Sequence, residues 1–313
     1  MKVIHVAYPL ELPLVDYDVS SIIIAIGDFD GVHLGHQDVI GQAVRIGQQR
    51  GLPVAVMTFH PHPREVLGKL TYSRYLSPLP EKLALIEDLG VDYTFVVQFD
   101  DAFSKVSPID FVQNVLMKLD VHTVVVGFDF TFGNQAEGTV ETLKELSDDQ
   151  MDVTVVKPYQ LQGEKISSTL IRELLHLGRL PHYSLYTGRH YRITGRVIHG
   201  DGRGQTIGFP TANIELSERY VIPANGVYAV RFVCGCETFN GVMNIGVRPT
   251  FQTEDDHPRL EVHVLDFDGD LYGQQVTVEF IEFLRPEQKF ANVQSLVKQI
   301  TEDVKHAREI FNK

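Results

Sequence analysis

Short strand-like runs alternate with helix-like runs over the first half of the chain, and this alternation constrains the fold more than any other feature. The strand-like runs are apolar almost throughout, as expected for strands buried on both faces of a parallel sheet. They are Ile22–Ile26, Val54–Phe59, Tyr93–Val97, Val121–Val126 and Val153–Val156. Helical patterns lie between and after them, at His36–Gly51, Pro80–Leu89, Pro108–Leu119, Val140–Leu146 and Ser168–Leu177. This order predicts a doubly wound, Rossmann-like α/β domain.

The second half has a different texture, because strand-like segments follow each other directly after about Tyr183. These segments are Tyr191–Ile198, Gly226–Val233, Phe239–Ile245, Leu260–Phe267 and Gln275–Phe283. Turn residues separate them, which predicts a small antiparallel barrel or sandwich. One amphipathic helix follows, with an apolar face made by Val293, Leu296, Val297, Ile300, Val304, Ala307 and Phe311. We therefore predict two domains, residues 1–183 and 184–313.

Composition narrows the class of protein. Of the 313 residues, 43% are hydrophobic and 22% are charged, which is typical of a soluble globular protein. The net charge of −13 argues against a nucleic-acid partner, since phosphate backbones are bound by clustered Lys and Arg. We find no signal-peptide pattern and no apolar run of membrane-spanning length, so we predict a cytoplasmic protein without a membrane partner. Cys234 and Cys236 are then expected to be free thiols.

The segment Gly27–His36, with the sequence GDFDGVHLGH, joins the first strand-like run to the first helix. Ligands of open α/β sheets collect at this position, at the carboxyl ends of the strands. Gly27 and Gly31 allow the backbone to turn sharply and to approach a phosphate closely. His33 and His36 project on one side of the helix start, where they can donate to phosphate oxygens. The histidines alone fit an ordinary turn equally well; the flanking strand and helix favour a nucleotide site.

A second polar segment, Lys165–Arg172, lies where a loop enters a helix. Ser167, Ser168 and Thr169 place hydroxyls beside the free amides of the helix N-terminus, which can bind an anion. Arg172, about one turn further on, can form a forked contact with the outer phosphates. A plain serine N-cap is the alternative interpretation of the serines.

The second half contains a glycine-rich loop, Gly200–Asn213, that includes Gly202 and Gly208. Its amides can bind phosphates, and the Thr211 hydroxyl and the Asn213 amide oxygen can bind a metal. The sequence has no Gly-x-x-x-x-Gly-Lys-Ser/Thr stretch, which excludes a P-loop kinase. On physical grounds alone, the loop could equally be the turn-rich rim of a barrel.

Two acidic features lie further along the chain. Glu261 alternates with Leu260 and Val262, so its side chain points away from an apolar row, into a cleft or into solvent. The acidic stretch Asp266–Asp270 lacks the glycine and the closing glutamate of an EF-hand loop. We therefore expect an ordinary hairpin turn there.

In the first half, these motifs together resemble the FMN adenylyltransferase module of bacterial bifunctional FAD synthetases, within the HxGH nucleotidyltransferases. The segments that carry the resemblance are Gly27–His36, Thr58–Pro63, Val126–Gly133 and Ile166–Arg172. The resemblance implies an ATP site formed by Gly27, Phe29, Asp30, Gly31, His33, His36, Ser167, Ser168, Thr169 and Arg172. It places Asp129 in the loop near nucleotide and flavin. Asp28 stands where Asn is more frequent and His60 where an acid is more usual, and we assign no role to His60.

In the second half, the glycine-rich loop resembles that of the flavokinases. The resemblance extends through Asn225–Tyr228, Asn244–Phe251, Glu261–His263 and Leu284–Glu287, so both halves together cover nearly the whole chain. It implies that Glu261 is the catalytic base and that Arg285 contacts the flavin. It also implies that Gly202, Gly208, Pro210, Thr211 and Asn213 bind ATP, with Thr211 and Asn213 at the metal.

Three hypotheses follow. The first is a bifunctional enzyme that phosphorylates riboflavin to FMN and adenylylates FMN to FAD, with Mg²⁺ as cofactor and ATP as co-substrate. The second is a nucleotidyltransferase for another phosphate ester, and the third is a flavin-binding regulator. Retention of His33, His36, Thr211, Asn213 and Glu261 favours an active enzyme. Its partners are then riboflavin, FMN, FAD and ATP; weak self-association of chains stays open.

Overall fold

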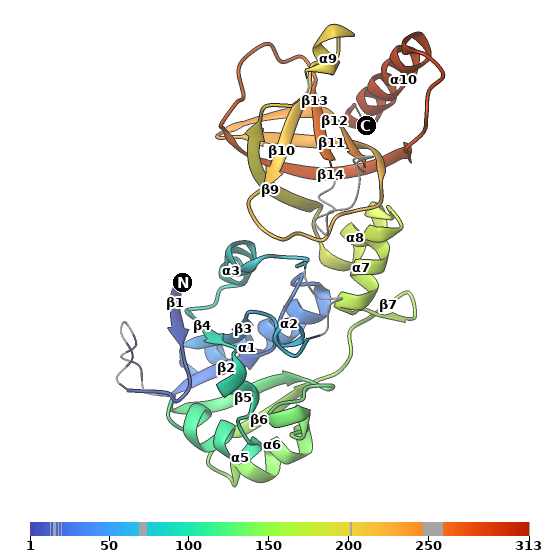
Figure 1. Ribbon diagram of the computed structural model, residues 1–313. Coiled ribbons are helices and arrows are strands. Elements are labelled where there is room, and N and C mark those ends of the chain that lie inside the picture. Colours follow the sequence, from blue (N-terminus) through green and yellow to red (C-terminus); the bar gives the residue numbers. More distant parts are fainter. Residues whose placement is uncertain are drawn as a thin grey trace. The chain divides into compact units, whose positions relative to one another are not determined.

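The computed structural model contains two compact units, Met1–Ser168 and Thr169–Lys313 (Figure 1). It describes residues 1–12, 14, 17, 19, 21–68, 74–200, 202–246 and 259–312. The domain boundary after residue 183 stays a prediction.

The first unit is built on a six-stranded sheet with the order β1-β4-β3-β2-β5-β6, in which all neighbouring strands are parallel. The strands are β1 (Lys2–Val6), β2 (Ile22–Ile26), β3 (Val54–His60), β4 (Tyr93–Gln98), β5 (Val121–Gly127) and β6 (Asp152–Val156). All five residues of β2 are buried, because helices cover both faces of the sheet. The predicted doubly wound architecture is confirmed.

The two faces of this sheet carry separate hydrophobic cores. On one face the core includes side chains from α1 (Leu34–Arg50) and α3 (Leu79–Glu87). The other face is covered by α4 (Asp101–Ser104), α5 (Pro108–Phe111), η2 (Val112–Leu116) and α6 (Val140–Ser147). The helix predicted over Pro108–Leu119 is thus one α-helical turn followed by a π-helix. Smaller elements are α2 (Pro63–Val66), η3 (Asn134–Ala136) and the two-stranded ribbon of β7 (Gln160–Leu161) and β8 (Glu164–Lys165).

The chain order reverses between β2 and β5. From β2 the chain continues into β3 and β4 on one side, whereas β5 and β6 lie on the other side. Such a reversal is the topological switch point where open α/β sheets bind their ligands. The loops that leave the carboxyl ends of β2 and β5 begin at Gly27 and Phe128.

The second unit is a closed antiparallel barrel with the strand order β10-β13-β12-β11-β14-β9. Its strands are β9 (Tyr191–Ile198), β10 (Ala212–Leu216), β11 (Gly226–Cys234), β12 (Glu237–Gly246), β13 (Arg259–Val264) and β14 (Gln275–Pro286). Its helices are α7 (Ser168–His176), α8 (Leu180–Thr187), α9 (Arg203–Thr206) and α10 (Val293–Phe311). The sequence predicted either a barrel or a sandwich. Because the sheet is closed, the second unit is a barrel.

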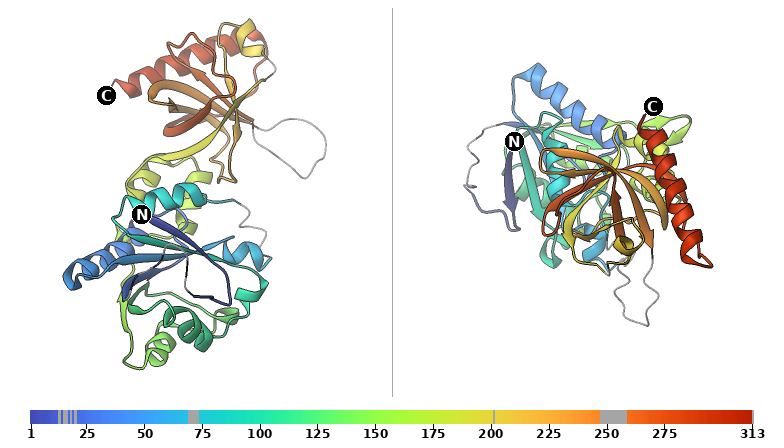
Figure 2. Two further views of the ribbon diagram at one scale, coloured as in Figure 1. Left: turned by 90° about the vertical axis from the view of Figure 1, so that its left-hand side faces the viewer. Right: turned by 90° about the horizontal axis from the view of Figure 1, so that it is seen from above.

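Helix α10 lies along the outside of the barrel (Figure 2). Its Ala307 is fully buried, and Val304 and Phe311 pack with it against Val227 and Val242 of the barrel wall. The predicted apolar face is therefore correct over the second half of the helix. Its first member is not covered, because Val293 is 57% exposed.

The segment Asp266–Asp270 is not the hairpin turn expected from its sequence. It leaves β13 and leads to β14, and these two strands are not neighbours in the barrel. The β13 strand ends at Val264, and Asp266 has a φ of 56° and is paired with Arg308 of α10. The β11–β12 connection, by contrast, is a true hairpin, and its turn carries Cys234 and Cys236 as free thiols.

Candidate active sites

The loop between β2 and α1 is held in an unusual conformation at the switch point. Phe29, Gly31 and Val32 all have positive φ, at 55°, 84° and 34°. For phenylalanine and for the β-branched valine this conformation is strained, and such strain is concentrated at functional sites. Gly27 allows the loop to fold back on itself, because a Cβ on Gly27 would lie 2.9 Å from the Phe29 ring.

The buried side chain of Asp30 anchors this loop to the segment around Leu76 and Ser77. One carboxylate oxygen accepts hydrogen bonds from the backbone amides of Leu76 (3.0 Å) and Ser77 (3.1 Å). The Ser77 hydroxyl in turn accepts from the amide of Gly31 at 2.8 Å. Ser168, the last residue of the first unit, donates to the Asp30 carbonyl at 2.9 Å. Asp30 thus acts here as a structural anchor of the loop predicted to bind ATP.

His33 and His36 lie together at the N-terminus of α1. Their rings are stacked, with centroids 3.6 Å apart, and Phe29 packs edge-on against His36. His33 is the N-cap residue, and its Nδ1 accepts from the backbone amide of His36 at 3.3 Å. Because an amide can only donate, the proton of the neutral ring is on Nε2, the atom that can donate to an anion. A helix N-terminus with such donors suits a phosphate.

Four residues form a polar group beside the start of this loop: Asp28, Thr58, His62 and Lys82, called the Asp28 cluster below. Lys82 of α3 donates to the Asp28 carbonyl at 2.7 Å, and its Nζ lies 3.7 Å from Oδ1 of the Asp28 carboxylate. Thr58 of β3 donates to the same carbonyl at 2.8 Å. His62 lies 3.1 Å from the other carboxylate oxygen through Nε2. Its Nδ1 accepts from the Arg64 amide, so Nε2 carries the proton.

The electrostatics of this cluster favour a charged Asp28. Burial raises the pKa of the Asp28 carboxyl, but the charge of Lys82, the hydrogen bond from His62 and the nearby His36 lower it. The lowering effects dominate, so the pKa lies well below its ordinary value. Asp28 is therefore a carboxylate at neutral pH.

The remaining residues predicted for the first site are described within the unit to which each belongs. Asp129 follows β5, next to β2 in the sheet, and forms an ion pair with Lys165 at 2.8 Å. The Lys165 ammonium also lies over the exposed Phe128 ring, 4.3 Å from its centroid. Ser167 directly precedes α7, whereas Thr169 and Arg172 lie on α7 in the second unit.

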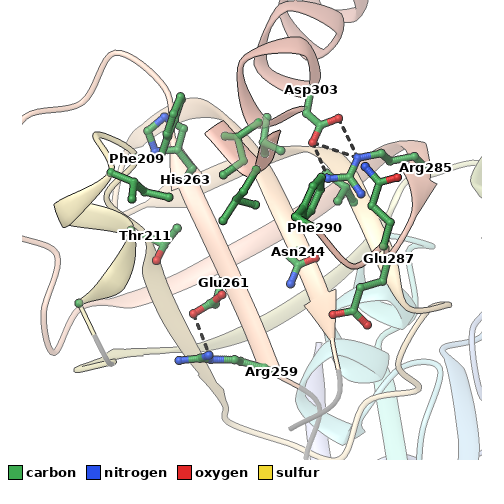
Figure 3. Close-up of a pocket in the computed structure, with 18 residues that line it drawn as sticks. Phe209, Thr211, Asn244, Arg259, Glu261, His263, Arg285, Glu287, Phe290 and Asp303 are labelled. Atoms are coloured by element: carbon green, nitrogen blue, oxygen red, sulfur yellow. Dashed lines mark hydrogen bonds and ion pairs between the residues drawn. The ribbon is translucent and has the colours of Figure 1, made fainter. Parts of the chain in front are cut away.

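The second unit contains a cavity of about 340 Å³ between the barrel wall, the glycine-rich loop and α10 (Figure 3). Among the predicted residues, Gly202, Thr211, Glu261 and Arg285 line it. Leu260 and Val262 are buried, so Glu261 points from the opposite side of β13 into the cavity. Glu261 is paired across the sheet with Asn213 of β10 on one side and with Asn244 of β12 on the other.

This pairing places oxygen donors on one side of the wall. Residues directly opposite each other on neighbouring strands project to the same face, so Asn213, Glu261 and Asn244 form a row. Of this row, Glu261 and Asn244 line the cavity, as does Thr211 just before β10. Carboxylate, amide and hydroxyl oxygens are the ligand types that Mg²⁺ accepts, so this donor set fits the metal that the flavokinase resemblance implies.

The glycine-rich loop lies close against this row. A Cβ on Gly200 would lie 2.0 Å from Nδ2 of Asn213, so any larger residue there would displace the Asn213 side chain. Gly202 has a φ of 68° and is the N-cap of α9, and Gly208 has a φ of 86°. His263 of β13 holds the other end of the loop, because its Nδ1 donates to the Pro210 carbonyl at 2.7 Å.

Arginine side chains occupy two sides of the cavity. Nε of Arg259 lies 3.1 Å from Oε1 of Glu261, with each side chain about one quarter exposed. Arg285, predicted to contact the flavin, is paired with Asp303 of α10, which its Nη2 meets at 2.8 Å. The Arg285 guanidinium lies 5.8 Å from the centroid of the Phe290 ring, at the cavity edge (Figure 3).

Several site residues were not predicted from the sequence, although some carried a signal. Asn244 and His263 lie within segments that support the flavokinase resemblance, but no role was assigned to them. Lys82 shares the buried face of α3 with Ile86, and a lysine on an apolar helix face is a detectable anomaly. His62, within the Thr58–Pro63 segment of the family resemblance, is buried beside Asp28, although only His60 in that segment stands out in the sequence. Arg259 and Asp303 had no sequence signal, since their roles depend on tertiary contacts.

An HxGH loop at the switch point of a doubly wound sheet defines the first unit as a nucleotidyltransferase fold of the HxGH class. Comparison with known families agrees with this class and extends it. Residues 16–170 match the FAD synthetase family, and residues 187–311 match the riboflavin kinase family.

Full-length relatives have the same two parts. The bifunctional riboflavin kinase/FMN adenylyltransferase of Bacillus subtilis (strain 168) is 41% identical over 314 residues, covering 100% of this chain and 99% of the relative. The protein of the same description from Escherichia coli (strain K12) is 40% identical, covering 92% of each chain. The chain belongs to the family of bifunctional riboflavin kinase/FMN adenylyltransferases.

A solved structure matches the fold over nearly the whole chain. It is a Streptococcus pneumoniae protein described as a macrolide-efflux protein, with a TM-score of 0.88 and 30% identity, covering 97% of this chain and 99% of that one. In this chain, no helix among the described residues is long and apolar enough to cross a bilayer.

Proposed function

We propose that this chain makes FMN from riboflavin in its second unit and FAD from FMN in its first, with ATP as co-substrate of both reactions. The observations that carry the proposal are that His33 and His36 stack at the switch point of the first unit, and that Glu261 lines the cavity of the second unit together with Thr211 and Arg285. Family membership supports the same pair of reactions and the same order of domains. We also propose that the protein is cytoplasmic.

In the kinase reaction, Glu261 accepts the proton of the terminal ribityl hydroxyl of riboflavin. The hydroxyl oxygen then bonds to the γ-phosphorus of ATP, and the bond from that phosphorus to the β-phosphate oxygen breaks, which releases ADP. The Gly202 and Gly208 region provides amides for the phosphates. Thr211, Asn213 and Asn244 would hold Mg²⁺, which supplies charge neutralisation between the phosphates when bound.

In the adenylyl transfer, an oxygen of the FMN phosphate attacks the α-phosphorus of ATP, and pyrophosphate leaves. His33, through its Nε2 proton, and His36 donate to the phosphates as negative charge develops on the leaving group. The family resemblance also assigns Ser167, Ser168, Thr169 and Arg172 to the ATP triphosphate. Asp129, in the loop after the neighbouring strand β5, would lie near the nucleotide and the flavin in this proposal.

One assay tests both parts. The full chain is incubated with ATP, Mg²⁺ and either riboflavin or FMN, and the flavins are separated by chromatography. Formation of FMN and FAD from riboflavin, and of FAD from FMN, is the expected result. FMN that is never adenylylated would overturn the first assignment, and riboflavin that is never phosphorylated would overturn the second.

A further inference from the structure

The Asp28 cluster contains a lysine in a place where stability alone does not require one. Lys82 is only 2% exposed and shares the inward face of α3 with the buried Ile86. Burial of an ammonium group is unfavourable unless it is paired, and a buried ion pair is often no more stabilising than well-packed apolar side chains. The pair of Lys82 and Asp28 therefore calls for a functional explanation.

The position of the pair provides that explanation. The Lys82 ammonium contacts the Asp28 carbonyl, which belongs to the loop that continues to His33. Asp28 is followed by Phe29, whose ring packs edge-on against His36, and the nearby His36 lowers the pKa of the Asp28 carboxyl. The pair and the histidines therefore share one electrostatic environment. In a partly buried setting, unit charges interact more strongly than in water.

We propose that Lys82 contributes positive charge to the phosphate site of the first unit, and that Asp28 offsets this charge. The balance between the Lys82 and Asp28 charges determines how tightly the site binds the ATP triphosphate and the released pyrophosphate. A neutral residue at position 28 would leave the lysine uncompensated and would hold pyrophosphate longer. This inference rests on the proposed adenylyl transfer.

The charges can be changed with little change in shape. With Asp28 and Lys82 both present the pair is neutral; Asp28→Asn leaves one positive charge, Lys82→Met leaves one negative charge, and the double variant is neutral again. In the Asp28→Asn variant, the side-chain amide oxygen can still accept from Nε2 of His62. Thr58 still donates to the carbonyl at position 28 when Lys82 is replaced, so one anchor of the loop remains.

The experiment measures inhibition of FAD formation from FMN by inorganic pyrophosphate at pH 8, with the full chain. We expect Asp28→Asn to bind pyrophosphate roughly three- to tenfold more tightly and Lys82→Met to bind it more weakly by a similar factor. The double variant should return to within about twofold of the wild type. Lys144→Met, the same charge change on an exposed position of α6, is the matched control and should change nothing.

A purely structural role gives a different pattern. If the cluster only shapes the loop, Asp28→Asn leaves pyrophosphate binding unchanged or weaker, and the double variant is at least as impaired as Lys82→Met. Either result overturns the inference. Riboflavin phosphorylation by the same samples verifies active protein, and Asp28→Ser removes the same charge should Asp28→Asn not fold. A wild-type chain that makes no FAD would instead refute the proposed function.

Discussion

Arg259 and Glu261, two residues apart on β13, form an ion pair inside the kinase cavity, with Nε of the arginine 3.1 Å from Oε1 of the glutamate. Residues at this spacing project from the same face of a strand. Each side chain is partly buried, so the pair is less screened than a fully exposed one. The contact fixes one carboxylate oxygen of Glu261, the proposed base. The backbone of Glu261 is fixed by strand pairing with Asn213 on one side and Asn244 on the other.

We predict that Arg259→Gln lowers kcat for FMN formation by about three- to tenfold, with little change in KM for ATP. The reason is that an unheld base spends less time aligned with the ribityl hydroxyl. Steady-state kinetics with riboflavin and ATP measure both parameters, and Arg259→Lys should recover part of the loss. A rise in KM for ATP alone would show that Arg259 contacts the nucleotide instead.

Glu261→Gln should abolish FMN formation and leave FAD formation from supplied FMN intact. The amide keeps the shape of the side chain but cannot take the hydroxyl proton, and loss of a general base typically costs about 10²- to 10⁴-fold. Glu237→Gln, at the exposed start of β12, is the control. If both activities fell together in a folded Glu261→Gln protein, the two sites would not be independent.

The fold was largely predictable because periodicity reports burial directly. The Ile22–Ile26 run is apolar throughout, and the structure places it as the fully buried centre of the sheet. Periodicity does not, however, show which strands pair with each other in a sheet. The loop after β13 contains the same residues that a hairpin turn would use, but closure of the barrel places β14 beside β11 and β9.

In the candidate sites too, local motifs were predictable from the sequence and long-range contacts were not. His33, Thr211 and Glu261 belong to contiguous motifs, so the sequence identified them before any geometry was known. Lys82 and Asp303 act on residues far along the chain, at Asp28 and Arg285, and only the folded structure brings these partners together. Asp28 stands out in the sequence as a departure from the family pattern, but its contact with Lys82 is visible only in the folded structure.

His33→Ala should give the pattern opposite to that of Glu261→Gln. Removal of one preorganised donor to developing charge typically costs about 10²- to 10³-fold in kcat, so FAD formation from FMN should fall by that factor. Riboflavin phosphorylation should be unchanged. His122→Ala, a histidine on β5 away from the loop, provides the control. If the His33→Ala variant formed FAD at the wild-type rate, the proposed role of the histidine pair would be wrong.

Asp303→Ala should destabilise the second unit. Asp303 is buried, and it accepts hydrogen bonds from both Arg285 and Gln299. Its loss leaves the partly buried Arg285 without its carboxylate, a change that typically costs about 3 kcal/mol. The urea midpoint for loss of kinase activity should fall, whereas Asp268→Ala, in the loop after β13, should leave it unchanged. An unchanged midpoint for Asp303→Ala would mean that the pair does not hold α10 to the barrel.

The depressed pKa of Asp28 makes a prediction about stability and pH. Because Lys82 and His62 hold the folded-state pKa below its ordinary value, the ionised carboxylate stabilises the fold at every pH above about 4, its unfolded pKa. This contribution is lost as the pH falls through the folded-state pKa. The melting temperature of the wild type should therefore exceed that of Asp28→Asn by a constant amount from pH 8 to pH 5, and the difference should shrink below about pH 4. Calorimetry of the two proteins across this range measures it. A difference that already changes between pH 8 and pH 5 would contradict the assignment of the effect to the Asp28 carboxylate.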